Sequence, residues 1–180
     1  YVDYDRPNLP TVGNCIFGNT FVDNLREISH TSQAYDSGVN YWSSLVELGY
    51  YNNTGAPFDN YIGNNWSDYK SRYPSAVEVD GSEMWNTAYN IDGGSNKDSY
   101  PLMKPWANYS RVDCGDVDCS GAVDVYDVYP VFRRVFGDPV CSGWAADVDC
   151  SGAVDVYDVY PVFRRVFGDP VDCCKGCQQP

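Results

Sequence analysis

The 180-residue sequence has few basic side chains, a single histidine, two methionines and no long apolar run. Its 12 lysines and arginines stand against 25 acidic residues, which gives a formal net charge of −13. Nucleic-acid binding needs a basic surface, and a membrane-spanning helix needs a run of about 18 or more apolar residues. We therefore expect neither a nucleic-acid partner nor a membrane span.

Patterns of catalytic residues are also scarce. With His30 as the only histidine, a Ser-His-Asp triad is not indicated. Polysaccharide-cleaving enzymes need carboxylates gathered on one face, whereas the acidic residues of the first hundred positions are scattered over predicted turns. We expect the protein not to be an enzyme.

The sequence does contain a 25-residue segment that occurs twice. Residues 116–140 read DVDCSGAVDVYDVYPVFRRVFGDPV, and residues 147–171 repeat them without a change. Calcium binds six to eight oxygen ligands, and a twelve-residue loop supplies them from positions 1, 3, 5, 7, 9 and 12 around a glycine at position 6. Both copies fit this spacing, so we predict two calcium ions. The predicted ligands are Asp116, Asp118, Ser120, the Ala122 carbonyl, Asp124 and Asp127, and in the second copy Asp147, Asp149, Ser151, the Ala153 carbonyl, Asp155 and Asp158.

A third calcium site is an open alternative outside the repeat. The segment DGSEMWN at 80–86 contains Asp80 and Glu83, and Asp92 follows soon after. Carboxylates of this kind in turn-rich sequence are also common on solvated surfaces without any ion.

Each loop leads into an apolar segment that contains a proline. A proline is tolerated in the first turn of a helix but breaks a hydrogen bond farther inside. We therefore expect the first helix to begin near Val128, with Asp127 as both N-cap and calcium ligand. The buried face, through which the two copies would pack together, is then predicted to comprise Val128, Phe132, Val135 and Phe136, and in the second copy Val159, Phe163, Val166 and Phe167.

Residues 113–172 resemble a type I dockerin repeat. The resemblance is carried by the loop pattern DxDxSGxxDxxD, which ends in Asp, is followed by one helix and is duplicated. It implies a calcium-binding module that docks onto a cohesin domain, with recognition by the two residues before the last loop aspartate. Those positions are Val125 and Tyr126, and Val156 and Tyr157. Family members commonly have small hydroxyl residues there, and the aromatic residues depart from that pattern.

The first 110 residues have a different composition, with short apolar runs between turn signals rich in Asn and Gly. Such a pattern favours a β-solenoid or a sandwich. The segments NYIGNNWSDY (60–69) and YNIDGGSNKDSYPLMKPW (89–106) resemble the closing coils of the NosD-like right-handed parallel β-helix family. This resemblance covers about residues 12–106. Taken together, the two resemblances imply a short β-solenoid over residues 1–110, followed by a dockerin-like calcium module with a cysteine-rich tail over residues 111–180. We do not expect the copper binding of that family here, because copper sites need imidazole or soft sulfur ligands and His30 is the only histidine.

Eight cysteines favour an oxidising, extracellular compartment. The sequence alone does not fix their pairing, but equivalent spacings in the two copies favour Cys119–Cys141 and Cys150–Cys173. A metal cluster at Cys173, Cys174 and Cys177 is the alternative. Asn-X-Ser/Thr motifs, which are candidate glycosylation sites in a secreted chain, begin at Asn52, Asn65 and Asn108.

Together these features predict a secreted, calcium-binding, disulfide-stabilised structural protein at the cell surface. It would assemble head to tail into an extracellular filament, with residues 1–12 docked on a neighbouring copy, or remain a monomer capped by its own residues 1–12. The alternative is a dockerin-bearing carbohydrate-binding or carbohydrate-active protein on a cohesin scaffold, with tyrosine and tryptophan side chains contacting a polysaccharide. Binding to a panel of polysaccharides would distinguish the two.

Overall fold

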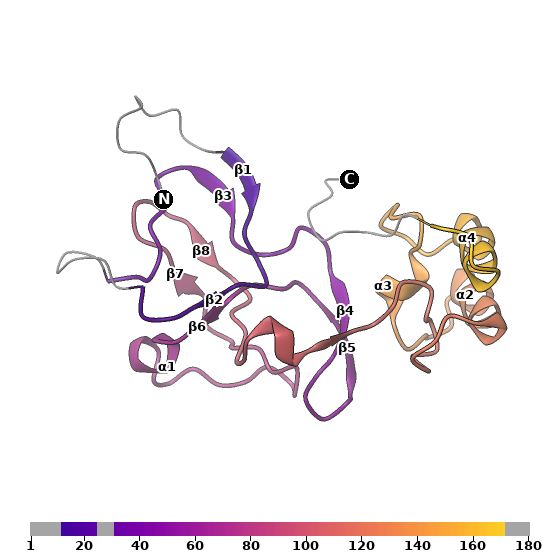
Figure 1. The fold of residues 1–180 in the computed structure, drawn as a ribbon, viewed down its shortest axis with the longest axis horizontal. Coiled ribbons are helices and arrows are strands. Elements are labelled where there is room, and N and C mark those ends of the chain that lie inside the picture. The colour runs from indigo at the N-terminus through magenta and orange to yellow at the C-terminus, as the bar shows by residue number, and fades with distance from the viewer. Residues whose placement is uncertain (1–11, 25–30, 172–180) are drawn as a thin grey trace.

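The computed structural model describes residues 12–24 and 31–171, which form two adjoining parts (Figure 1). We call residues 12–24 and 31–112 the β-rich part, and residues 113–171 the paired-loop part. The first holds β1 (Val12–Cys15), β2 (Thr20–Phe21), β3 (Val39–Tyr41), β4 (Leu48–Tyr51), β5 (Pro57–Asn60), β6 (Asn65–Trp66), α1 (Tyr69–Arg72), β7 (Tyr89–Asn90), β8 (Lys97–Asp98), the 3-10 helix η1 (Trp106–Asn108) and β9 (Ser110–Arg111). The second holds α2 (Val125–Val135), α3 (Gly143–Ala146) and α4 (Val156–Val166).

The strands of the β-rich part form small separate sheets, so the predicted β-solenoid is wrong. β1 pairs with β3 and β2 with β6 in parallel, whereas β5, β4 and β9 form an antiparallel sheet, and β7 and β8 an antiparallel pair. A solenoid needs parallel strands stacked in successive coils. Here the turn at Asn52–Gly55 reverses the chain and makes β4 and β5 antiparallel neighbours. The Asn52 side chain stabilises that turn by accepting from the backbone N–H groups of Thr54 and Ala56.

A buried polar pair joins segments that the short strands leave unpaired. Asn64 and Asp98 are fully buried. The Asp98 carboxylate accepts from the Asn64 backbone N–H at 2.6 Å and from the Trp66 indole N–H at 2.9 Å. The Asn64 amide donates to the backbone carbonyls of Ile16 and Trp42 at 2.8 and 3.0 Å. Buried polar groups need such partners, and these bonds connect positions up to 48 residues apart in sequence.

Aromatic side chains fill the interior of the β-rich part. The Trp66 ring lies between Phe21 and Tyr89, with ring centroids 4.2 and 3.9 Å away. Trp42 and Tyr69 belong to the same buried cluster. Because these rings are used in packing, they are not available as a flat platform for a sugar.

One aspartate and one tryptophan connect the two parts. The Asp59 carboxylate, from β5, accepts from the Ser142 hydroxyl at 2.8 Å and from the Gly143 backbone N–H at 2.6 Å. It therefore caps the start of α3, where unpaired backbone N–H groups favour an anion. Trp144 packs against the cores of both parts, and Figure 1 shows α3 between the β4–β5 strands and the longer helices.

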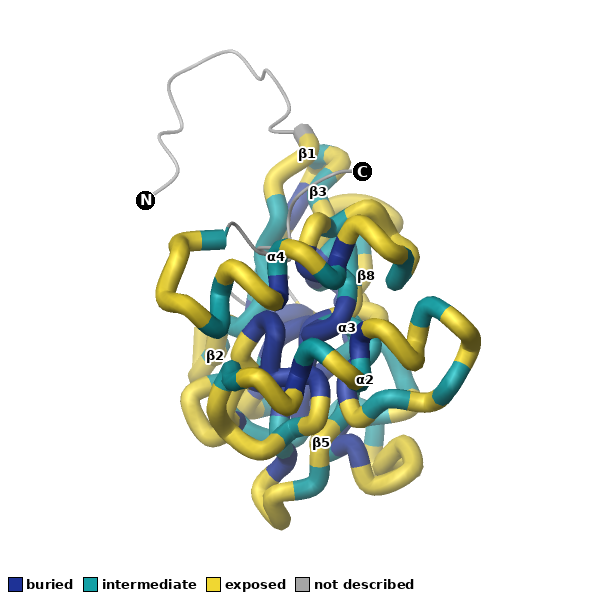
Figure 2. Tube along the Cα trace, turned by 90° about the vertical axis from the view of Figure 1, so that its right-hand side faces the viewer, coloured by how far each residue is buried: buried dark blue, intermediate teal, exposed yellow. Residues whose placement is uncertain are grey.

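α2 and α4 lie side by side at the end of the molecule farthest from β1 and β3 (Figures 1 and 2). α2 begins at Val125, earlier than predicted, and its N-cap is Asp124 rather than Asp127. Asp127 instead occupies the third helical position and completes a capping box with Asp124. Pro130 consequently lies inside the helix rather than in its first turn.

The predicted buried face of these helices is only partly right: Val128 and Val159 pack against the core, whereas the phenylalanines are exposed. The buried residues of α2 are Asp127 and Val131, with Val128 packed against the same core, whereas Phe132 and Phe136 are 48% and 73% exposed. The physical reason is the inward anchoring of Asp127, which fixes the rotation of the helix about its axis. α4 repeats this arrangement, with Asp158 and Val162 buried and Phe163 and Phe167 exposed.

Candidate metal centre

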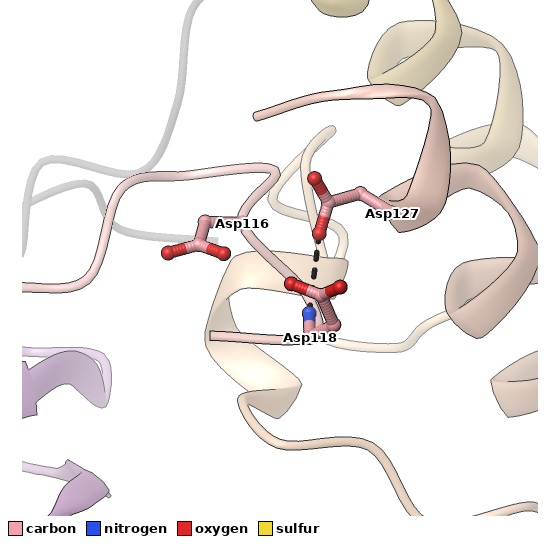
Figure 3. Close-up of side chains that lie close together, drawn as sticks. All are labelled: Asp116, Asp118 and Asp127. Atoms are coloured by element: carbon pink, nitrogen blue, oxygen red, sulfur yellow. Dashed lines mark hydrogen bonds between the residues drawn. The ribbon is translucent and has the colours of Figure 1, made fainter. Parts of the chain in front are cut away.

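Each loop of the repeat gathers three carboxylates. In the first loop, oxygens of Asp116, Asp118 and Asp127 all lie within 4.8 Å of one another. Figure 3 shows that they come from the start of the loop and from the first turn of α2. Asp116 and Asp127 are buried and Asp118 is exposed, so the group opens to solvent on one side. The second triad consists of Asp147, Asp149 and Asp158. The predicted grouping of these six aspartates is confirmed.

Backbone N–H groups hold the first triad in place. The two oxygens of Asp116 accept from Ser120 N at 2.9 Å and Gly121 N at 3.0 Å. Asp127 Oδ1 accepts from Val117 N at 2.7 Å, and its Oδ2 accepts from Asp124 N at 2.8 Å. The glycine makes the close turn possible, because Gly121 has φ +90°, a conformation that other residues rarely adopt.

The second loop has the same internal bonds. Asp147 accepts from Ser151 N and Gly152 N, each at 3.0 Å. Asp158 accepts from Asp149 N at 3.0 Å and from Asp155 N at 2.9 Å. Identical sequences therefore produce the same local carboxylate arrangement at two places in the molecule.

Burial makes three of these carboxylates costly to ionise when no cation neutralises them. Desolvation raises the pKa of Asp127 and of Asp158, although backbone N–H groups that donate to both carboxylates oppose the shift. Desolvation also raises the pKa of Asp147. A cation next to each triad would reverse this effect, because an opposite charge favours the ionised form.

The remaining predicted ligands have other partners in the structure. Asp124 Oδ1 accepts from the Tyr126 backbone N–H at 2.7 Å as the helix N-cap, and Asp155 does the same with Tyr157. The Ser120 hydroxyl donates to the Ala122 carbonyl at 3.2 Å, and Ser151 donates to Ala153 at 3.0 Å. The structure therefore brings the three carboxylates of each loop together, while the side chains of Ser120 and Asp124, with their equivalents, bond to nearby backbone groups.

One neighbour of the first triad was not predicted. The Tyr51 hydroxyl, at the end of β4, lies 3.4 Å from Asp116 Oδ2 and donates to it. No sequence signal indicates this contact, because it joins residues 65 positions apart across the boundary between the two parts.

No third group of metal-ligating side chains forms in residues 12–24 and 31–171. Glu83 is paired with Lys104 at 2.6 Å. The Asp92 carboxylate accepts from the backbone N–H groups of Thr31 and Ser32 at 2.7 and 2.8 Å. The suggested third site using Asp80, Glu83 or Asp92 is therefore not supported by this part of the chain.

A disulfide joins the first loop to the segment before α3. Cys119 and Cys141 are bonded, with Cα atoms 5.9 Å apart and a sequence separation of 22. This is the pair that the spacing favoured. Cys150 is also disulfide-bonded, and its expected partner, Cys173, lies outside the described residues.

The three candidate glycosylation sites differ in exposure. The Asn52 amide donates to the Gly81 carbonyl at 2.9 Å, and the Asn65 amide donates to Leu102 at 3.1 Å. Asn108 is exposed, so a glycan would fit most easily at Asn108.

The four predicted partner-binding residues are exposed as well: Val125, Tyr126, Val156 and Tyr157.

Compared with protein-family models, curated proteins and solved structures, the chain matches none of them. The two triads are thus defined by their own geometry and not by relatives. All six side chains offer hard carboxylate oxygens, and either group could bind a metal ion. Among the described residues, no helix has the length and apolar character that crossing a membrane requires.

Proposed function

We propose that the chain is an extracellular calcium-binding assembly protein in which two calcium loops orient a pair of helices for a protein partner. One observation carries the proposal. In both copies of the repeat, a triad of carboxylates lies beside a helix that begins inside the loop and has exposed apolar side chains. The resemblance of the loop pattern to type I dockerins also supports a protein partner.

The donor set favours calcium over softer metals. Calcium prefers carboxylate and carbonyl oxygens in flexible arrangements of six to eight ligands, whereas zinc and copper prefer nitrogen and sulfur. Each triad supplies three carboxylates, and the serine hydroxyl and alanine carbonyl nearby are further oxygens. Bound calcium would supply positive charge, and two ions would reduce the formal net charge from −13 to −9.

The last loop aspartate connects the metal site to the helix. Asp127 is a member of the triad, and its Oδ2 also accepts from the Asp124 backbone N–H in the capping box. Asp158 has the same two roles in the second copy. A ligand that fixes these carboxylates would therefore also stabilise the first turns of α2 and α4, which determine where their exposed side chains point.

The disulfides support the proposed location. All five described cysteines are disulfide-bonded, and such bonds persist mainly in oxidising compartments outside the cytosol. The bond between Cys119 and Cys141 joins the metal loop to the segment leading into α3. It stabilises the fold because it restricts the conformational freedom of the unfolded chain.

Calcium titration followed by thermal unfolding tests the proposal. A ligand that binds only the folded state raises the melting temperature by mass action, so calcium should raise it and a chelator should lower it. Magnesium should have a much smaller effect, because it demands a tighter octahedral geometry. An unchanged melting curve after chelation of a calcium-loaded sample would contradict the proposal.

A further inference from the structure

The outer sides of α2 and α4 carry two identical rows of exposed apolar residues. We define the α2 stripe as Val125, Tyr126, Tyr129, Phe132 and Phe136, and the α4 stripe as Val156, Tyr157, Tyr160, Phe163 and Phe167. Every member is between 45% and 73% exposed. Figure 2, which views the molecule from this end, shows exposed turns of both helices toward the viewer.

The spacing within each stripe is that of a helix-packing seam. Val125, Tyr129, Phe132 and Phe136 follow one another at intervals of four, three and four residues. This is the interval at which one helix packs its side chains into a facing helix. The opposite side of α2, at Val131, is already buried in the paired-loop core. The stripe is therefore a second packing face that has no partner among the described residues.

The exposed apolar area is large for a monomer. An aromatic side chain buries roughly 150–250 Å² when it is fully covered. With about half to three quarters of eight rings exposed, the two stripes together offer on the order of 1,000 Å². The largest apolar patch of a typical monomer covers about 300–600 Å², and a stable interface uses about 800 Å² from each partner. The stripes therefore provide enough area for a stable protein interface.

The charges at the helix ends do not oppose the packing of two identical stripes. The exposed Arg133 at the C-terminal end of α2 is paired with Asp138 at 2.6 Å, and Arg164 of α4 is paired with Asp169 at 3.1 Å. Asp118 and Asp149 belong to the metal triads, so a bound cation would offset their charge. An antiparallel crossing of two such helices also aligns their dipoles favourably.

We propose that a second copy of this chain covers the stripes. The helices of the two copies pack antiparallel, with a stripe of one copy against a stripe of the other. The inference deepens the proposed function by naming its partner, and it rests on that function because the loops orient α2 and α4. The contact uses residues of the repeat and does not depend on the predicted docking of residues 1–12, most of which lie outside the described residues.

The test is the mass of the full chain in solution, measured by light scattering and sedimentation in calcium over a wide range of protein concentration. The wild type should show a concentration-dependent mass of two or more chains. The double variant Phe136→Glu with Phe167→Glu should weaken association by at least about 100-fold, because it places unpaired charges in an apolar contact. Phe136 and Phe167 are exposed and lie outside both triads, so folding and calcium binding should survive.

A matched control places the same two charges on exposed valines of the β-rich part. Val22 and Val77 are 56% and 58% exposed, and Val22→Glu with Val77→Glu should associate like the wild type. A wild type that remains a monomer at every concentration would overturn the inference, even if a different protein then bound to it. Association that the stripe variant leaves unchanged would overturn it as well.

Native mass spectrometry of the same samples separates this inference from the proposed function. A monomer that still carries two calcium ions refutes the second copy as partner and leaves the calcium proposal standing. A chain that takes up no calcium refutes the proposed function itself.

Discussion

Replacing Asp127 with asparagine tests the connection between the metal loop and the helix. Asp127 is fully buried, and its two oxygens accept from Val117 N at 2.7 Å and Asp124 N at 2.8 Å. Asn has nearly the same shape but only one acceptor oxygen. In either orientation its amide N–H group faces a backbone N–H that then loses its acceptor. We expect a cost of about 1–3 kcal/mol without calcium, the usual cost of leaving a buried donor unsatisfied.

Calcium should increase this difference between wild type and variant. A site filled at about 100 times its dissociation constant stabilises the folded state by about 2.7 kcal/mol. The variant should lose that contribution from the first loop and keep it in the second. For a chain of this size, each kcal/mol changes the melting temperature by about 2–4 °C. The calcium-dependent part of the loss should therefore be about 5–10 °C.

Thermal unfolding of wild type and Asp127→Asn, each in calcium and in chelator, measures both contributions. Asp138→Asn is a suitable control, because it also removes one carboxylate from the repeat but breaks only a solvent-exposed pair with Arg133, which water and salt screen. If wild type and Asp127→Asn respond equally to calcium, the reasoning about this aspartate is refuted.

Three further predictions concern the rest of the molecule. Burial raises the pKa of Asp98 to about 6 from 3.8, so the folded state binds more protons than the unfolded state between these values. The unfolding free energy of wild type relative to Asp98→Asn should therefore fall by roughly 2 kcal/mol between pH 4 and pH 7 in urea titrations; a constant difference would contradict it. Replacing Cys119 and Cys141 by serine should cost about 3 kcal/mol in the same assay, and a change below about 1 kcal/mol would count against it. Asp59→Ala should lower stability by about 2–4 kcal/mol and increase amide exchange around Trp144, whereas unaltered exchange there would show that Asp59 does not hold the two parts together.

The metal triads could be predicted from the sequence because their spacing reflects the geometry of a cation. Asp116, Asp118 and Asp127 have to lie at fixed places in a twelve-residue loop to share one ion, and such spacing is local in sequence. The sequence does not show which aspartate caps the helix, because Asp124 and Asp127 are both good N-cap residues. Both sides of α2 carry apolar residues, so periodicity alone does not show which side faces the core, and the prediction that Phe132 and Phe136 are buried is wrong for that reason.

The β-rich part could not be predicted for a different reason. Its strands are two to four residues long, too short for hydrophobic alternation to identify partners. The contacts that hold it together, such as those of Asn64 and Asp98 with distant backbone groups, depend on tertiary structure. The same turn residues that suggested repeated coils instead reverse the chain in the β4–β5 hairpin.

The central claim is that two identical loops each hold one calcium ion and that this binding orients α2 and α4. Native mass spectrometry of the unreduced chain in calcium tests it most directly. We predict a mass increase of two calcium ions for the wild type, one for Asp127→Asn, one for Asp158→Asn and none for the double variant. A wild type without bound calcium, or a double variant that still binds two ions, would contradict the account.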